Sequence, residues 1–243
     1  MKKLITICLA VLVIAAGVRA EAVSTSDAWM DWTSLNITGD ITWSDKTSYS
    51  YAYAEDDTGW AEDYLYEPGW VYTYAFASIG DSYWSYGGAE TSDDYLYEQV
   101  YAIANETTTP WAYAEAEAYR WGNFTASSDG WVEISADYEL WQELSTGDVG
   151  ESAYGYAGAG LWLQNYSTYE WDQDVPYLEN SVWDGGYTNL SDAGTLTVAI
   201  YFNAGDSGFF QAGVYNGAEV QIPEPATLSL LGLGALSLVR RRK

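Results

Sequence analysis

The chain has 243 residues, with 35 Asp and Glu against nine Lys and Arg and no histidine, which gives a formal net charge of −26. Most of the basic residues lie at the two ends, so the segment 21–221 has only Lys46 and Arg120 against 34 carboxylates, a formal charge of −32. A surface of this sign repels nucleic acids and anionic lipids. The lack of histidine excludes Ser-His-Asp and Cys-His catalysis and the usual zinc sites.

Residues 1–20 have the three parts of a secretory signal peptide. A positive start over 1–3 precedes an apolar run over 4–16, and small residues lead to a predicted cut between Ala20 and Glu21. The apolar run covers about 20 Å of helix, less than the roughly 30 Å of a bilayer core, which argues against a permanent anchor. We therefore expect an N-terminal signal helix that directs the chain to the Sec machinery and is then removed.

The single cysteine, Cys8, lies inside this apolar run and away from the predicted cut, so no lipoprotein is expected. After cleavage the remaining chain has no cysteine and can form no disulfide. Its stability must then come from packing, and 13 Trp and 23 Tyr offer the apolar area for it. At roughly 200 residues, 21–221 fits a single all-β domain.

The other end of the chain, 222–243, also has three parts in series. The prolines of Pro223-Glu224-Pro225 restrict the backbone, so this triplet should form an extended, stiff segment that an enzyme cleft can read. The Leu- and Gly-rich run over 226–239 predicts a hydrophobic helix that is short for a membrane span, and therefore a transient anchor in the inner membrane. The chain ends on a basic stop that obeys the positive-inside rule, formed by Arg240, Arg241, Arg242 and Lys243.

This tail resembles the PEP-CTERM sorting signal, and the triplet, the apolar run and the terminal basic cluster carry the resemblance. The resemblance implies processing by an exosortase, a membrane-embedded cysteine protease, and export to the surface of a Gram-negative bacterium. Proteins with this tail are associated with exopolysaccharide production, biofilm and floc formation. A GPI signal is the alternative, and the basic end argues against it.

A period of two dominates 21–221, which is the pattern of β-strands with one face buried. It predicts an antiparallel, jelly-roll-like β-sandwich of about nine or ten strands. The last two predicted strands are joined by Gly205-Asp206-Ser207-Gly208, which indicates a β-hairpin. The predicted strands are 35–43, 48–55, 70–79, 95–104, 111–121, 131–141, 153–163, 196–202 and 209–215.

Two short motifs occur twice. Asp63–Glu67 has the same sequence as Asp94–Glu98, and Ala52–Glu55 has the same sequence as Ala112–Glu115. These repeats suggest duplicated strand pairs. Because Tyr, Ala and Glu are abundant, matches by chance are the alternative.

Acidic runs in predicted loops raise the possibility of a Ca²⁺ site, since clustered carboxylates are ligands of hard cations. The runs are Glu55-Asp56-Asp57 and Asp93-Asp94, and neither has the spacing of an EF-hand. Solubility explains the same acids, so we expect no cofactor.

Paired carboxylates leave a glycosidase open, since that chemistry needs only two acids beside a sugar ring. Glu115 and Glu117 share one strand face, as do Glu133 and Asp137. The sequence shows no pocket that would raise the pKa of one partner, so we do not expect an enzyme.

The aromatic residues have two interpretations. Exposed rings suit stacking on sugars, and Trp60, Trp70, Trp84 and Trp111 are candidates at loops or strand ends. The alternative is that the rings form the core and cross-strand pairs. Together these features predict a non-catalytic cell-surface or matrix protein, with a carbohydrate-binding module and a glycan hydrolase as alternatives.

Overall fold

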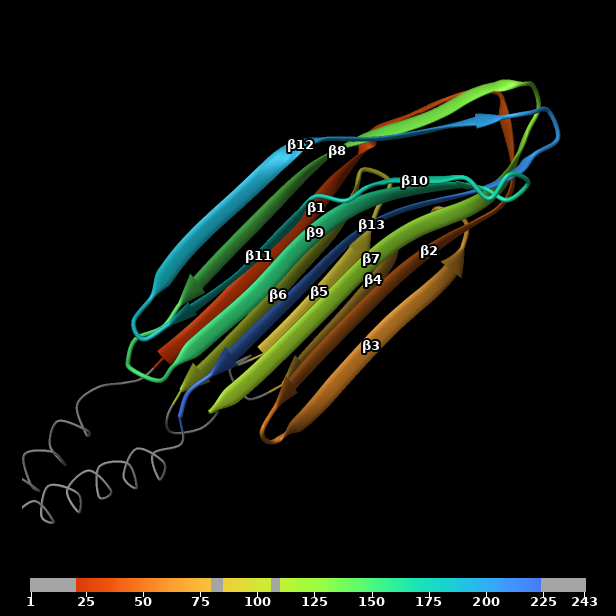
Figure 1. Ribbon diagram of the computed structural model, residues 1–243. Coiled ribbons are helices and arrows are strands. Elements are labelled where there is room, and N and C mark those ends of the chain that lie inside the picture. Colours follow the sequence, from red (N-terminus) through yellow and green to blue (C-terminus); the bar gives the residue numbers. More distant parts are fainter. Residues whose placement is uncertain (1–20, 80–84, 106–109, 224–243) are drawn as a thin grey trace, which may run out of the picture.

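The computed structural model describes residues 21–79, 85–105 and 110–223, and these form two antiparallel sheets packed face to face (Figure 1). The predicted antiparallel sandwich is confirmed. Its jelly-roll detail is not supported, because a jelly roll has eight strands and the described residues form thirteen. The predicted signal helix and C-terminal helix lie outside the described residues, and within them no helix is long and apolar enough to cross a membrane.

Each sheet takes strands from distant parts of the chain. Sheet A has the order β12-β8-β1-β6-β5-β4, and sheet B has the order β10-β9-β13-β7-β2-β3, with β11 also paired to β9. The strands are β1 Glu21–Thr38, β2 Ile41–Asp56, β3 Gly59–Pro68, β4 Thr73–Ile79, β5 Ser85–Thr91, β6 Tyr95–Asn105, β7 Trp111–Ala126, β8 Gly130–Ser145, β9 Ser152–Asn165, β10 Trp171–Asp174, β11 Tyr177–Trp183, β12 Tyr187–Phe202 and β13 Ser207–Gln221.

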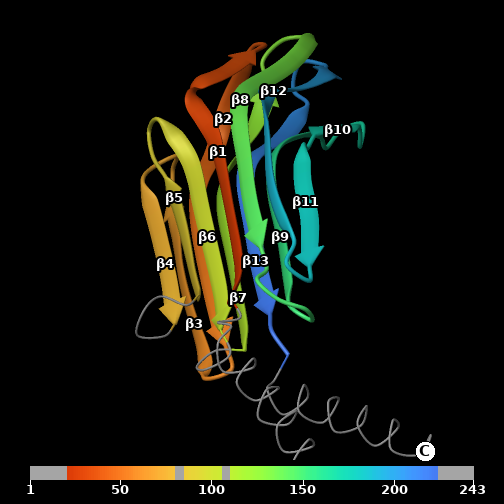
Figure 2. The same cartoon turned by 90° about the vertical axis from the view of Figure 1, so that its left-hand side faces the viewer.

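Small side chains fill much of the space between the sheets. On β7 every second residue from Ala112 to Ala118 is a fully buried alanine, and Ala52 and Ala54 continue this pattern on β2. Larger buried side chains lie further along the sandwich, among them Phe124 on β7, Phe202 on β12 and Phe210 on β13. The edge-on view shows the two layers lying against each other (Figure 2). The interior is therefore an alanine-lined half joined to a phenylalanine- and leucine-lined half.

The alanine-lined half brings main chain against main chain. A Cβ atom placed on Gly87 of β5 would lie only 2.5 Å from the carbonyl oxygen of Glu115 on the facing sheet. Short side chains also bridge the sheets, because the Ser24 hydroxyl donates to the Tyr154 carbonyl at 2.7 Å and the Ser85 hydroxyl donates to the Tyr113 carbonyl. Such contacts require that neither sheet carries a bulky side chain there.

The tyrosines and tryptophans lie mainly on the outer faces, so the prediction of an aromatic core is wrong for most of them. Among the described residues no Trp side chain is buried, and the buried aromatic side chains are Phe124, Phe202, Phe210 and Tyr138. Alternation puts one face of each strand inside, and here the inside face of most strands is the one with Ala, Val and Leu.

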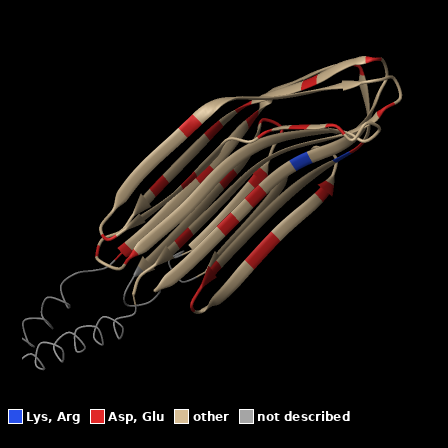
Figure 3. Ribbon diagram, viewed as in Figure 1, with Lys and Arg blue, Asp and Glu red and all other residues tan. Residues whose placement is uncertain are grey.

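One cluster of Trp residues closes the sandwich at the bend of β1. The indole of Trp70 meets Trp32 and Trp43 edge to face, with ring centroids 5.3 and 4.7 Å away. Both cations of the described chain contact this cluster: the Lys46 amine lies 4.1 Å from the Trp70 ring centroid, and the Arg120 guanidinium lies 4.8 Å from that of Trp32. Figure 3 shows these two blue segments in one part of the sandwich, while acidic residues are spread along the strands.

Two strand predictions were wrong. The predicted strand 35–43 is the end of β1 and the start of β2, separated by a turn at Gly39 with a φ of 106°. The predicted hairpin around 205–208 is a crossover, because β12 pairs with β8 in sheet A and β13 pairs with β7 and β9 in sheet B. Asp206 holds this crossover by accepting hydrogen bonds from the main chain and side chain of Asn203 at 2.9 and 3.2 Å.

Four whole strands, β3, β5, β10 and β11, and most of β1 were not predicted from the sequence. On the edge strand β3 seven of the ten residues are exposed and none is fully buried, so the alternation that marks a half-buried strand is weak. Strand β10 has four residues, too few to show a period.

The repeated motifs fall in different places. Ala52–Glu55 and Ala112–Glu115 face each other on the neighbouring strands β2 and β7, where Tyr53 pairs with Glu115 and Glu55 pairs with Tyr113. Asp63–Glu67 lies on the exposed edge strand β3, whereas Asp94–Glu98 lies at the start of the inner strand β6. A duplication of strand pairs stays a prediction.

The close approach at Gly87 gives the first testable prediction. Gly87→Ala should lower the free energy of unfolding by about 1–3 kcal/mol, because the new methyl group overlaps the facing main chain. Gly88→Ala is the matched control, since its Cβ would meet Phe76 at an ordinary 3.6 Å. Urea denaturation of both variants measures the difference, and equal stabilities would contradict this account of the interior.

Candidate functional site

The sorting tail leaves the fold directly after β13. The Ile222 side chain is buried, and its amide donates a hydrogen bond of 2.8 Å to the Pro110 carbonyl. The ring of Pro223 lies against Gly150, because a Cβ there would be 2.7 Å from the proline Cγ. The first residue of the predicted motif is thus part of the folded body, whereas Glu224, Pro225 and the basic stop 240–243 lie outside the described residues.

The start of β1 borders the same loop as this exit. A Cβ placed on Gly147 would lie 3.6 Å from the main-chain nitrogen of Glu21, the residue after the predicted signal cut. Glu21 and Pro223 therefore flank one loop, 146–151, at one end of the sandwich, as the start of β1 and the end of β13 show in Figure 1. Ala20, on the other side of the predicted cut, lies outside the described residues.

The outer face of sheet B carries a lattice of tyrosine and glutamate. On β2, Tyr49, Tyr51 and Tyr53 point outward and pair across to β3 and β7. The Tyr53 hydroxyl donates to Glu55 at 2.6 Å, and the Tyr113 hydroxyl donates to Glu115 at 2.8 Å in the matching motif of β7.

Glycines on neighbouring strands let some of these rings lie flat on the sheet. Tyr119 covers Gly213, where a Cβ would come within 2.0 Å of the ring, and Tyr215 covers Gly158 in the same way at 2.3 Å. Each of these is a directly opposed cross-strand pair. The result is a flat face with closely packed rings.

One of the two carboxylate pairs considered for a glycosidase lies on the outer face of sheet B, and the other lies on the outer face of sheet A. Glu115 and Glu117 belong to the tyrosine lattice, and burial followed by the charge of Glu115 raises the pKa of Glu117. Glu133 and Asp137 are exposed on β8 in sheet A, where Asp137 accepts a hydrogen bond from the Thr195 hydroxyl at 2.5 Å. Neither pair lines one of the two hollows described on the surface.

The candidate tryptophans differ in access. Trp60 is 64% exposed at the start of β3, whereas Trp70 is packed in the Trp cluster and donates its indole N–H to the Trp121 carbonyl at 2.9 Å. Trp111 is half-buried and its indole N–H donates to Glu219 at 3.2 Å. Trp84 lies outside the described residues.

The acidic runs proposed for Ca²⁺ gain no support. Asp56 closes the β2–β3 turn by accepting hydrogen bonds from the amide and hydroxyl of Thr58 at 2.7 and 2.6 Å. In the part of the chain that the structure describes, no three carboxylates lie together as metal ligands.

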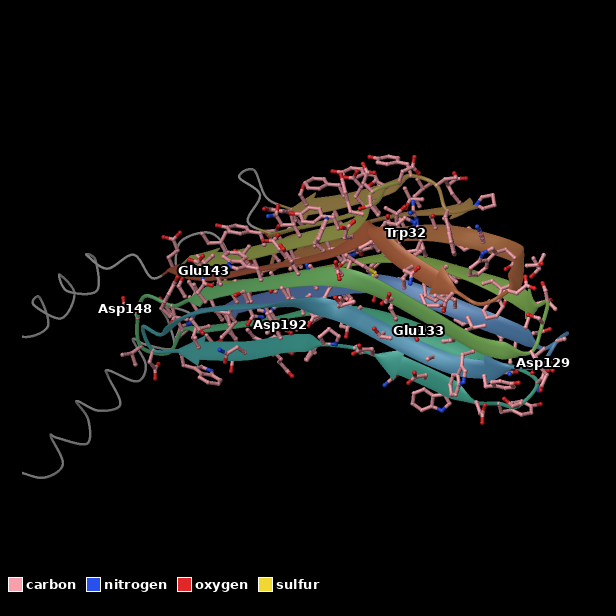
Figure 4. The ribbon with its side chains drawn as sticks, turned by 90° about the horizontal axis from the view of Figure 1, so that it is seen from above. Trp32, Asp129, Glu133, Glu143, Asp148 and Asp192 are labelled. Atoms are coloured by element: carbon pink, nitrogen blue, oxygen red, sulfur yellow. The ribbon has the colours of Figure 1, made fainter. Side chains whose placement is uncertain are left out.

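A groove on the outer face of sheet A was not expected from the sequence. Its volume is about 790 Å³. Figure 4 shows one of its residues, Asp192, on β12 between Glu143 toward one end of the sandwich and Glu133 toward the other. The tryptophans predicted as candidates were those at loops and strand ends, whereas the two in this groove lie within strands. The lining residues are Asp27, Trp29, Tyr97, Glu139, Leu140, Trp141, Ser191, Asp192 and Ala193.

The interior also contains polar groups, and the side chain of Glu98 on β6 is fully buried there. Neither carboxyl oxygen of Glu98 makes a hydrogen bond, and the side chain of Gln142 is also without a partner. Burial, with a smaller contribution from the charge of Glu117, raises the pKa of Glu98 well above its usual value. The Asn216 side chain crosses from sheet B and donates to the carbonyls of Ser26 and Glu98 at 3.1 and 3.2 Å.

The raised pKa of Glu98 sets the sign of a pH effect. The folded state holds this proton more tightly than the unfolded state, so Glu98 costs stability as the pH rises above the unfolded value of 4.5. Glu98→Gln should therefore raise the free energy of unfolding more at about pH 7 than at about pH 4. Glu62→Gln on the exposed edge strand removes the same charge and is the control. A gain that is equal at both pH values would contradict the buried, protonated carboxyl.

Comparison with known proteins identifies the tail. The family model of the PEP-CTERM protein-sorting motif matches residues 221–243. No curated protein matches the chain. Among solved structures, the C-terminal globular domain of an oligosaccharyltransferase from Pyrococcus abyssi is similar over 77% of this chain and 42% of its own, at 10% identity and a TM-score of 0.15, which supports no inference about fold or function.

The chain therefore carries a PEP-CTERM sorting motif at its C-terminal residues 221–243. This motif implies an exported protein that an exosortase processes and sorts to the cell surface.

Proposed function

We propose that the protein is a non-catalytic component of the cell surface or extracellular matrix of a Gram-negative bacterium, where it gives structure or adhesion to an exopolysaccharide matrix. The sorting motif supports the route to the surface. The charge of −32 on 21–221 supports a role in a hydrated layer, because it keeps the protein soluble and repels nucleic acid and anionic lipid.

The position of the two processing points supports this proposal. Glu21 and Pro223 lie at one end of the sandwich, so the predicted signal cut and the sorting tail share that end. The long faces of both sheets then extend away from that end (Figure 1). A surface protein that contacts its surroundings through its faces needs this arrangement.

Carbohydrate binding is the second candidate function, and one observation favours it. Large aromatic side chains are exposed on strands of both sheets, and rings of this kind stack on sugars while their polar tips make hydrogen bonds.

A glycan hydrolase finds less support. Glu115 and Glu117 lie on a flat face, and hydrolysis needs two carboxyl groups on opposite sides of a bound sugar. If the protein released reducing sugar from host polysaccharide, and if changing one of these glutamates to glutamine abolished that activity, the protein would be a hydrolase and the proposal of a non-catalytic role would be wrong.

The sorting route predicts two new termini. In its host, the protein should begin at Glu21 and lack 240–243, and mass spectrometry of the purified protein locates both ends. Replacing Pro223, Glu224 and Pro225 with alanine should leave the uncut chain in the membrane fraction, because the stiff motif is lost. Pro68→Ala, another proline that follows a glutamate, is the control and should be processed normally. An uncut chain in the cytosol of the unaltered strain would contradict the sorting route.

The matrix role predicts a phenotype that does not depend on catalysis. Deleting the gene should lower the amount of polysaccharide that stays attached to washed cells, and the intact gene should restore it. The triplet-to-alanine variant should fail to restore it, because the protein does not reach the surface. Equal retention in all strains would leave the matrix role without support.

A further inference from the structure

We infer that the groove on the outer face of sheet A binds a neutral polysaccharide chain. The rings of Trp29 and Trp141 stack on its sugars, and the carboxylates of Asp27 and Glu139 accept hydrogen bonds from its hydroxyl groups. This inference rests on the proposed matrix role and names the ligand class and the site for it.

The strand register places aromatic and acidic side chains in alternation. On the neighbouring strands β1 and β8, Trp29 is opposite Glu139 and Asp27 is opposite Trp141. The two indoles are thus diagonal neighbours on one face, at positions about 7–8 Å apart. Both indoles are half-buried, so their rings are held by the sheet while part of each surface is open to a ligand. A chain of sugar rings can contact both of them.

Small residues keep the groove open beside these rings. On the edge strand β12, Ser191 is opposite Trp141 and Ala193 is opposite Glu139. Their short side chains leave a volume of about 790 Å³, which lies within the range of roughly 300–1,000 Å³ for ligand sites. Because β12 is the edge of sheet A, the groove is open at its side and suits a long chain rather than a single small molecule.

A hydrogen bond orients the Asp27 carboxylate, which lines the groove. The Tyr97 hydroxyl donates to Asp27 at 3.3 Å. Burial raises the pKa of Asp27, against the opposing effect of hydrogen bonds from Gln99 and Tyr97. A partly desolvated carboxylate of this kind is stabilised when further groups, such as sugar hydroxyls, donate hydrogen bonds to it.

The chemistry of the lining selects the class of glycan. Ionised carboxylates only accept hydrogen bonds, and the two cations of the described chain, Lys46 and Arg120, lie at the Trp cluster instead of at the groove. Sugar hydroxyls are donors, so an uncharged polysaccharide fits. A polysaccharide with uronate or sulfate groups is repelled by the same carboxylates.

The tyrosine face of sheet B fits such a chain less well. Several of its hydroxyl groups are engaged with carboxylates, as Tyr53 is with Glu55, and rings such as Tyr119 already cover the glycine opposite. The groove of about 790 Å³ lies on sheet A, and the tyrosines of this lattice do not line it. The groove of sheet A combines free ring surface, acceptors and space.

Calorimetric titration tests this site with the processed protein purified from its host. The probes are neutral hexasaccharides of glucose, mannose and galactose, with an oligogalacturonate as the acidic comparison. We expect at least one neutral hexasaccharide to bind and the oligogalacturonate not to bind. Because the neutral probes carry no charge, the overall acidity of the protein does not contribute to the signal.

Matched variants locate the binding. Trp29→Ala and Trp141→Ala should each weaken the affinity about tenfold, the loss expected on truncating a central aromatic contact. Trp131→Ala is the control, since Trp131 is 64% exposed on the same face of β8 but does not line the groove. Trp29→Phe keeps a stacking ring and should retain most of the affinity, which separates lost stacking from misfolding. Asp27→Asn should weaken binding as well, because a strong acceptor is lost.

Three results would overturn the inference. They are unchanged affinity in both Trp→Ala variants, tighter binding of the oligogalacturonate, and no binding of any neutral probe up to about 10 mM. Any of them could occur with the protein still at the cell surface and polysaccharide still attached to the cells, and the matrix role would then stand without this groove. Loss of the surface location would instead remove the matrix role itself.

Discussion

The structure depends on the small size of the side chains between its two sheets. Alanines on β7 and β2 and Gly87 on β5 let the facing main chains come close, so that serine hydroxyls of one sheet reach carbonyls of the other. Close main-chain packing also explains how the Asn216 side-chain amide of one sheet can donate to carbonyls of Ser26 and Glu98 on the other.

The same constraint puts the aromatic residues outside. Because the inner positions accept only small side chains in one half of the sandwich, tyrosine and tryptophan occupy the alternate, outward positions of the same strands. There the rings pack on glycines, as Tyr119 does on Gly213, and bond to neighbouring carboxylates. The outer faces gain rigidity from these contacts, and a rigid aromatic face is well suited to bind a flat, repetitive ligand.

The charged residues are also divided between the outer faces and the interior of the sandwich. The acids lie along the strands of both sheets, whereas the two cations stabilise one internal contact, the Trp cluster, and Arg120 is fully buried there with a pKa lowered to about 10 by desolvation. The exposed surface is therefore acidic almost everywhere. The acidic surface then selects partners by repelling anions as much as by attracting the ligands that it binds.

The sequence by itself determined the route of the protein and its class of fold. The tail motif is local and depends only on the order of residues, and the comparison with known families confirmed it. The period of two was equally readable, so the strand at 131–141 was predicted correctly. Neither the tail motif nor the period of two depends on contacts between residues that are distant in the sequence.

Only the tertiary structure decided which strands pair and which aromatic residues are exposed. A glycine-rich turn at 205–208 is compatible with a hairpin or with a crossover, and the pairing of β13 with β7 and β9 selects the crossover. Likewise, the alternation of alanine with tyrosine on β7 shows two faces but does not say which one meets the facing sheet. The groove at Trp29 and Trp141 arises from residues more than 100 positions apart in the chain, because the register of β1 on β8 places them on one face.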